Sequence, residues 1–454
     1  MTQKEALDLL KMGKNIYLTG QAGSGKTYLL NKYIKFLKGH RVPVAITAST
    51  GIAATHLNGN TIHSWSGIGI KSEISASDLG KIARNSQKRE KIRDAKVLII
   101  DEISMLHGNR LNLVNKVCKY IRKSSRPFGG LQVILCGDFF QLPPIQEHGD
   151  TTINFAYKSD AWKELEPNIC YLDEQHRQLD DSFLRLLNEI RSQEVTEYTF
   201  EKLQTRLNKS VSDEFVPTKL YTHNLDVDKI NQAELAKIDT PSSIFKMVTK
   251  GKKELIETLK KGCLAPEELE LKIGASVMFI KNNPSKGYIN GTVGKVIKFS
   301  EQGHPIIRTF DGREVTASPV SWPFEEGEKV IAEIGQIPLR LAWAITVHKS
   351  QGMSLDAAQI DLSKSFAYGM GYVALSRVKS LEGIKLLGIN QNALLVNSEV
   401  AILDIQIMKS SIEISNQLKL MGEARVEEEK NKFLIKLLSD KGDYEDDMFL
   451  GFNE

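Results

Sequence analysis

Short apolar runs separated by longer amphipathic stretches characterise the first part of the chain. The runs cover residues 15–19, 44–48, 97–100 and 131–136. Apolar runs of this length are typical of buried strands, and strands that alternate with helical stretches are typical of a parallel sheet covered by helices. The pattern therefore predicts an α/β domain over residues 1–170.

Residues 66–94 interrupt this alternation between the second and third strands. They show no strand pattern and contain glycine, polar and basic residues, among them Lys81, Arg84 and Lys88. We interpret this segment as a small helical subdomain inserted in the first domain.

A second alternating pattern predicts another α/β domain over residues 171–395. Its strand candidates are residues 219–222, 339–346, 358–362, 372–375 and 384–387. The interruption at residues 270–335 contains short strands with turn signals such as Asn290-Gly291, which predict a small antiparallel barrel. Residues 396–454 are helical and end in an acidic segment with interleaved aromatics, which we interpret as a frayed tail in preference to a peptide that docks on a protein partner.

Composition narrows the class of protein. A chain of 454 residues with 41% apolar content can bury more than one core, and its formal charge of +4 is too small to indicate a nucleic-acid partner. The four cysteines form no C-x-x-C pair, which argues against a zinc ribbon and fits a reducing setting. No apolar run reaches the roughly 18 residues of a membrane span, and no targeting segment precedes the first motif, so we expect a cytoplasmic protein of a prokaryote or a virus.

A phosphate-binding loop follows the first predicted strand. It is the string Gly20-Gln21-Ala22-Gly23-Ser24-Gly25-Lys26-Thr27, which matches G-x-x-x-x-G-K-T between a strand and a helix. In this motif backbone amides surround a triphosphate, the lysine reaches the terminal phosphates, and the threonine hydroxyl ligates magnesium. We therefore predict a site for a nucleoside triphosphate and Mg²⁺.

An acidic pair, Asp101-Glu102, ends the third predicted strand. The first carboxylate suits magnesium, and the second can orient and deprotonate the attacking water. Taken alone, such a pair more often marks a helix N-terminus, but behind a phosphate-binding loop we favour catalysis. These two motifs predict nucleotide hydrolysis and leave open what the energy drives.

Further strings resemble the PIF (petite integration frequency) DNA helicases, in the B branch of helicase superfamily one and related to RecD-like enzymes. The strings are A-S-T-G-I-A-A at 48–54, D-E-Q-H-R at 173–177, A-I-T-V-H-K-S-Q-G at 344–352 and Y-V-A-L-S-R at 372–377. The resemblance extends over about residues 3–390. It implies two RecA-like P-loop domains with a helical insertion in the first and an SH3-like barrel in the second.

The resemblance also implies individual roles around ATP and DNA. At the nucleotide it implies adenine recognition by Gln3, phosphate sensing by Gln141, arginine fingers at Arg177 and Arg377, and phosphate contacts at Gln351 and Gly352. It implies contacts with the backbone of single-stranded DNA by Thr50, Gly51, Thr61, His63, Ser64, Asn224, Thr346, His348 and Ser350. One departure is Met370, which stands where the family commonly has glutamine; another is that Gln3 lies almost at the terminus.

The strand at residues 131–136 leads into the most informative motif. It is preceded by residues 126–130, which resemble the family's signature region, and it delivers Asp138 and Gln141 to its tip. Pro143-Pro144 prevents a helix from covering that tip. Because the strand neighbours the one that carries Asp101, we predict that Gln141 lies beside the terminal phosphate and relays the nucleotide state to the grip on DNA.

The function that follows is an ATP-driven, Mg²⁺-dependent helicase that moves 5′ to 3′ on single-stranded DNA. Duplexes, forks, RNA-DNA hybrids and G-quadruplexes are the expected substrates, in replication, recombination, repair or telomere-type maintenance, and we expect a monomer in solution. Three alternatives remain open at this point: a translocase that does not unwind, an RNA helicase, and a clamp that retains the fold without hydrolysis. The presence of Lys26, Asp101 and Glu102 argues against the clamp.

Overall fold

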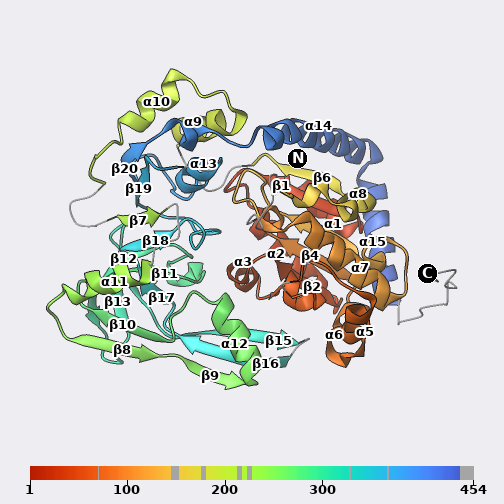
Figure 1. The fold of residues 1–454 in the computed structure, drawn as a ribbon, viewed down its shortest axis with the longest axis horizontal. Coiled ribbons are helices and arrows are strands. Elements are labelled where there is room, and N and C mark those ends of the chain that lie inside the picture. The colour runs from red at the N-terminus through yellow and green to blue at the C-terminus, as the bar shows by residue number, and fades with distance from the viewer. Residues whose placement is uncertain are drawn as a thin grey trace.

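The computed structural model describes residues 1–69, 71–144, 153–174, 180–211, 217–221, 227–326, 329–365 and 368–439. Figure 1 shows two parallel sheets on opposite sides of the molecule, with antiparallel strands extending below the second. The predicted α/β class with an antiparallel insertion is therefore confirmed. Among these described residues, no helix is both long and apolar enough to cross a membrane.

Six parallel strands form the first sheet. In spatial order they are β3 (Asn60–Thr61), β2 (Val44–Ala48), β4 (Val97–Asp101), β5 (Gln132–Cys136), β1 (Ile16–Gly20) and β6 (Asn168–Leu172). Every residue of β4, β5 and β1, three of the four inner strands, is buried, because helices cover both faces of the sheet. The four predicted strands are confirmed, and β6 extends the sheet to residue 172.

The helices of the first domain include the predicted insertion. They are α1 (Gln3–Lys11), α2 (Lys26–Gly39), α3 (Gly51–His56), α4 (Ile62–Ser66), α5 (Ala76–Arg84), α6 (Ser86–Asp94), α7 (Gly108–Arg122) and α8 (Asp160–Leu165). Within the predicted insertion at residues 66–94, the structure contains the helices α5 and α6, which cover most of residues 76–94. Arg122 holds the end of α6, because its guanidinium donates to the carbonyls of Ile92, Ala95 and Gly129 at 2.8 to 3.1 Å. Because Gly129 belongs to the signature run at residues 126–130, this run helps to hold the inserted helices against the first domain.

Four parallel strands form the second sheet, in the order β18 (Ala344–Thr346), β7 (Thr218–Tyr221), β19 (Ala358–Leu362) and β20 (Ile384–Ile389). Its helices are α9 (Asp181–Ser192), α10 (Glu197–Gln204), α11 (Val227–Ala236) and α13 (Met370–Leu375). The strand predicted at residues 372–375 is wrong, because α13 occupies it. This helix is buried on every side, so its short apolar run carries no periodicity that separates helix from strand.

The antiparallel part of the second domain is larger than predicted. Its largest sheet has five strands, in the order β14 (Glu314–Thr316), β13 (Pro305–Thr309), β12 (Val293–Phe299), β11 (Ser276–Phe279) and β17 (Leu339–Leu341). A second sheet has three strands, β15 (Val320–Glu326), β16 (Lys329–Gln336) and β9 (Val248–Gly251). The strands β10 (Glu268–Lys272) and β8 (Ser242–Lys246) form a separate pair. The predicted start at residue 270 is wrong, because the antiparallel strands begin with β8 at Ser242. No residue of β8 or β9 is fully buried, so neither strand shows a buried apolar run. The candidate at 339–346 is also wrong as one strand, since it divides into β17 and β18, which lie in different sheets.

The C-terminal helices return to the first domain. They are α14 (Ser398–Met421) and α15 (Glu423–Ser439), which confirm the helical prediction up to residue 439. In Figure 1 they wrap the first domain from the top to the right-hand side. The Tyr171 N–H of β6 donates to Ser411 Oγ at 3.0 Å, and Lys430 pairs with Asp8 of α1 at 2.6 Å. The acidic tail lies outside the described residues.

Candidate nucleotide and DNA site

One cleft of about 320 Å³ brings together most of the residues predicted to bind the nucleotide. The first domain lines it with Ala22, Gly23, Gly25, Lys26, Thr27, Asp101, Glu102 and Gln141. The second domain lines it with Gly352 and Arg377. The cleft therefore lies at the carboxyl ends of the first sheet's strands, where ligands bind in open α/β sheets.

The phosphate-binding loop is shaped by backbone that glycine tolerates best. Gly25 adopts a φ of 84° where it caps α2, so the first amides of that helix point toward the cleft. Lys26 Nζ donates to the carbonyls of Gly20 and Gln21 at 2.8 and 2.9 Å. Burial lowers the pKa of Lys26, while the nearby Asp138 and Glu102 act in the opposite sense. Ser24 Oγ is buried and has no hydrogen-bond partner among the described residues.

The acidic pair is held in an unusual conformation. Glu102 has a φ of 52°, a left-handed backbone that a glutamate adopts only at a cost. Two hydrogen bonds support it: the Glu102 N–H donates to Asp101 Oδ1 at 2.9 Å, and Ser49 Oγ donates to the Glu102 carbonyl at 2.7 Å. Burial, helped by the Asp101 charge, raises the pKa of Glu102 to about 7. A carboxyl group with this pKa suits a general base at neutral pH.

Gln141 and Arg377 meet across the cleft. Arg377 Nη2 donates to Gln141 Oε1 at 3.2 Å, and the arginine is almost completely buried. Its Nε donates to the Val373 carbonyl of α13 at 3.1 Å, which orients the guanidinium. The structure thus joins two residues that the sequence separates by 236 positions.

The remaining nucleotide candidates lie around this centre. Gln3 begins α1, and its Nε2 approaches the Ser24 carbonyl at 3.5 Å, so it lies beside the phosphate-binding loop. Gln351 is buried next to Gly352. Met370 packs as a buried residue of α13 and does not line the cleft. Arg177 lies outside the described residues.

The DNA candidates of the first domain lie at two helix starts. Thr50 caps α3 by accepting from the Ala53 N–H, and Gly51 is the first residue of that helix. Thr61 caps α4 in the same way by accepting from the Ser64 N–H at 3.2 Å. The helices follow β2 and β3, which are neighbours in the sheet, so both caps lie at one edge.

His63 is the titratable candidate of this group. It lies half-buried on α4, next to the exposed Ser64. Burial lowers its pKa, and the nearby charges of Arg110 and His107 lower it further. The neutral imidazole is therefore favoured at physiological pH, and it can still donate a hydrogen bond to a phosphate.

The DNA candidates of the second domain are less exposed. Thr346 ends β18 and accepts from the Lys349 N–H, while Ser350 is fully buried and donates to the Val347 carbonyl. His348 is half-buried, and burial lowers its pKa. Asn224 lies outside the described residues. Contact of these side chains with DNA stays a prediction.

Sequence reasoning missed several residues that line the cleft. Asn282 and Asn290 come from the loop between β11 and β12, and Lys379 follows Arg377 by two positions. The Asn290 N–H donates to Asn282 Oδ1 at 2.8 Å. Gly291 has a φ of 94°, and a Cβ there would lie 2.6 Å from the Ser354 carbonyl. The sequence shows the turn signal at Asn290-Gly291, but it does not show that this turn lies against Ser354, just after the motif at residues 344–352.

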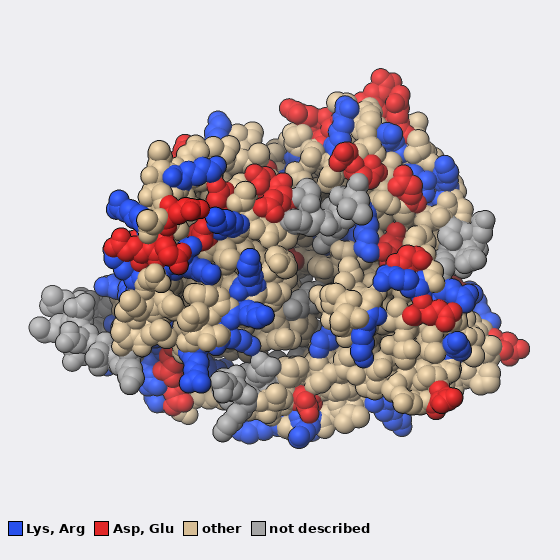
Figure 2. Space-filling view, turned by 180° about the vertical axis from the view of Figure 1, so that it is seen from behind, with Lys and Arg blue, Asp and Glu red and all other residues tan. Residues whose placement is uncertain are grey.

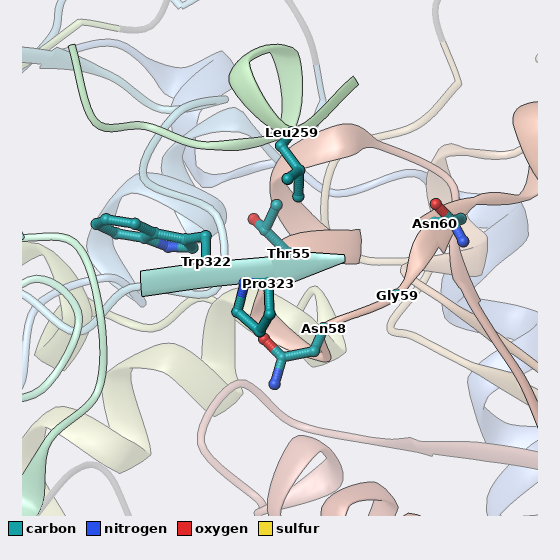
Figure 3. A pocket seen from close by; sticks show the side chains of 7 residues that line it. All are labelled: Thr55, Asn58, Gly59, Asn60, Leu259, Trp322 and Pro323. Atoms are coloured by element: carbon teal, nitrogen blue, oxygen red, sulfur yellow. The ribbon is translucent and has the colours of Figure 1, made fainter. Parts of the chain in front are cut away.

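The antiparallel insertion also reaches the first domain. A small cavity of about 20 Å³ lies between the two parts of the chain. On one side it is lined by Thr55 of α3 and Asn58, which follows that helix. On the other side it is lined by Leu259 of α12 (Lys253–Gly262) and by Trp322 and Pro323 of β15. In Figure 3, Leu259 of the insertion and Thr55 of the first domain point toward each other. The helix that starts at Gly51 is therefore covered by the insertion in this arrangement.

Charged side chains of both signs are mixed on the face of the molecule drawn in Figure 2. Figure 2 shows Lys and Arg interleaved with Asp and Glu over the opposite face, instead of one field of a single sign. This agrees with the near balance of 60 basic and 56 acidic residues. Recognition of a phosphate backbone would therefore depend on local donors.

Two parallel-sheet domains, with a phosphate-binding loop in one and an arginine from the other reaching its cleft, define a two-domain P-loop nucleoside triphosphatase of the helicase type. Family models described as PIF1-like helicase and as DNA helicase Pif1, 2B domain, match residues 2–205 and 254–299. A Psychrobacter protein named ATP-dependent DNA helicase Pif1 is 44% identical over 96% of this chain and 75% of its own length. The chain belongs to the PIF1-like helicase family.

Solved structures of the family are similar over most of the chain. Bacteroides Pif1 in complex with ADP-AlF4 is 30% identical, with a TM-score of 0.78 over 90% of this chain and 96% of its own. Bacteroides Pif1 bound to single-stranded DNA, also 30% identical over the same shares, has a TM-score of 0.60. The arrangement of this chain is thus closer to the first of these two structures.

Proposed function

We propose that this chain is a motor that moves 5′ to 3′ along single-stranded DNA and separates the strands of duplexes, forks, RNA-DNA hybrids or G-quadruplexes. Its family membership makes it an ATP-dependent DNA helicase that binds nucleotide and DNA. The direction and the substrates belong to the proposal, as does action as a monomer. The observation that supports coupling between the nucleotide and movement is the Gln141–Arg377 hydrogen bond, which links the two domains at the nucleotide cleft.

The hydrolysis step would use the residues of the first domain. Lys26 would leave the loop carbonyls to hold the terminal phosphates, and Glu102 would take a proton from the attacking water. Thr27 and Asp101 both line the cleft and offer hydroxyl and carboxylate oxygens, which are donors that suit Mg²⁺. When bound there, the ion would neutralise charge on the phosphates.

The second domain would complete the site and transmit its state. Arg377, with Arg177 as a second finger, would stabilise charge on the phosphates during transfer. Binding of ATP would close the domains over residues 1–170 and 171–395, and hydrolysis would reopen them. Because DNA candidates lie on both domains, alternating grip would convert this cycle into steps along the strand.

The direction is tested by duplexes with a single-stranded tail at the 5′ or the 3′ end. Unwinding that needs ATP and the 5′ tail is expected. Equal unwinding of both substrates would contradict the directional claim, and hydrolysis without any unwinding would favour a translocase. Matched DNA and RNA oligomers in the same hydrolysis assay would reveal an RNA helicase.

The relay is tested by Gln141→Ala. The expected result is hydrolysis that single-stranded DNA no longer stimulates, with unwinding lost to a greater degree than hydrolysis. The measurement is the ATP consumed per base pair separated, with and without DNA. An unchanged ratio would remove Gln141 from the relay.

A further inference from the structure

One buried arginine lies directly behind the Gln141–Arg377 pair. Arg191 is near the end of α9 and is only 5% exposed. Its Nη1 donates to both carboxylate oxygens of Asp138, at 3.0 and 2.9 Å, and its Nη2 donates to Asp404 Oδ1 at 3.0 Å. One guanidinium thus joins two carboxylates from segments far apart in the chain.

The first of these carboxylates belongs to the segment that carries Gln141. Asp138 and Phe140 face Arg191, whose guanidinium lies 4.1 Å from the centre of the Phe140 ring. Phe139, between them, packs instead into the first domain, 5.5 Å from the Tyr17 ring. Alternate side chains therefore anchor this segment in one domain and present it to the other.

The helix that leads to Arg377 meets the same guanidinium. Arg191 Nη1 donates to the Tyr372 hydroxyl of α13 at 3.2 Å. The Tyr372 ring packs against Phe140 with 6.3 Å between ring centres. Arg191 therefore contacts the chain a few residues before Gln141 and a few residues before Arg377.

The C-terminal helix supplies the second carboxylate. Asp404 lies on α14, which packs along β6 of the first domain, and its Oδ2 accepts from the Tyr171 hydroxyl at 3.5 Å. The helix follows the second domain in sequence but is held by the first. Asp404 thus fixes Arg191 from a third direction.

We propose that Arg191 is a positioning residue for hydrolysis, which sets the placement of Gln141 and Arg377 relative to each other, and that Asp404 makes α14 part of this assembly. A planar guanidinium can hold two carboxylates, a hydroxyl and an aromatic face at once, which lysine cannot. The inference rests on the proposed roles of Gln141 and Arg377. Arg191 does not line the cleft, so it acts through these two residues.

The test compares Arg191→Gln and Arg191→Lys with Arg206→Gln. Arg206 is another buried arginine, 7% exposed, that donates to the carbonyls of Ile384 and Glu382 within the second domain and does not line the cleft. Arg191→Gln should lower the DNA-stimulated kcat by about 10²-fold, the loss that a misplaced catalytic group produces, with the KM for ATP within about twofold. Arg191→Lys should recover a small part, and Arg206→Gln should keep kcat per folded molecule while it lowers Tm.

The double variant Arg191→Gln with Gln141→Ala separates positioning from stability. It should be slower than Gln141→Ala, because Arg377 is still misplaced, but by clearly less than the loss that Arg191→Gln causes alone, because residues that act as a unit are not additive. Asp404→Asn should lower kcat by less than Arg191→Gln, again with KM unchanged. A kcat of Arg191→Gln equal to that of Arg206→Gln, or additive losses in the double variant, would overturn the inference. If Gln141→Ala alone left the DNA-stimulated kcat unchanged, the proposed relay role of Gln141 would fail instead, whereas equal unwinding of 5′-tailed and 3′-tailed duplexes would count against the proposed motor.

Discussion

The two parallel sheets hold their functional residues in different ways. In the first sheet, Asp101 is the last residue of β4, and Gln141 and Lys26 follow β5 and β1, so the strand order β4-β5-β1 brings the three together. In the second, Arg377 follows the short helix α13 and depends on packing and on a hydrogen bond to Val373. The first domain therefore holds the groups that act on the phosphates in fixed positions. The second domain contributes the Arg377 guanidinium, which moves whenever that domain moves.

The largest expected effects compare one residue from each sheet. Lys26→Ala and Arg377→Ala should each lower kcat by about 10³-fold, because each removes a positive charge from the transferring phosphate. Lys26→Ala should also weaken ATP binding, since the loop holds the ground state. Arg377→Ala should leave the Kd for ATP within a few fold. Titration with a fluorescent nucleotide measures this, and equal losses of affinity would abolish the distinction between the domains.

Removal of the base should be slightly less severe. Glu102→Gln should lower kcat by about 10²-fold to 10³-fold while nucleotide and DNA still bind, because general base catalysis contributes an effect of this size. The measurement is single-turnover hydrolysis beside a nucleotide-binding titration. Asp181→Asn, on the first turn of α9, is a matched control that should hydrolyse ATP at the normal rate. A normal rate for Glu102→Gln would exclude it as the base.

The pH dependence tests the electrostatics of the first domain. The pKa of Glu102 is raised to about 7, and only the deprotonated carboxylate can accept a proton from water. The value of kcat/KM should therefore rise with pH below about 7, by about tenfold per pH unit, and level off above it. The Asp101 charge contributes to the raised pKa of Glu102. The variant Asp101→Asn should therefore show a pH profile, measured on its remaining activity, whose midpoint lies at lower pH. If kcat/KM did not change between about pH 5.5 and about pH 8, a range around the expected midpoint, Glu102 would not be the titrating base.

The smallest effect concerns the DNA edge of the first domain. Thr61→Ala should raise the Kd for single-stranded DNA by about fivefold to tenfold, the value of about one hydrogen bond, and should do so for every base composition. Thr61→Ser is the matched control, because it keeps both the hydroxyl and the cap on α4. Fluorescence anisotropy with several oligomers measures the change. A loss confined to one sequence would indicate base recognition instead.

The first sheet and its motifs were largely predictable. The apolar runs at residues 97–100 and 131–136 are buried on both faces, so their pattern survives in the sequence without ambiguity. The phosphate-binding loop and the acidic pair are local strings, and local strings need no tertiary contact to be recognised. The cleft then collects them because parallel strands end at the same edge.

The second domain was harder for physical reasons. A short helix that is buried all round, such as α13, has no polar face to reveal its period. Exposed edge strands such as β9 have the opposite defect, because no apolar face marks them. Asn282 lines the cleft only because a loop distant in sequence from the nucleotide motifs folds onto it, and Lys379 lines it beside Arg377, two positions earlier in the chain.

The sequence by itself determined that the chain is a P-loop hydrolase of two α/β domains, since spacing within short strings carries that chemistry. The tertiary structure alone decided which residues connect the domains. Gln141 meets Arg377, and Asp138 meets Arg191 and Asp404, through contacts between segments far apart in the chain. Such contacts depend on how sheets and helices pack, and no local pattern of apolar and polar residues records them.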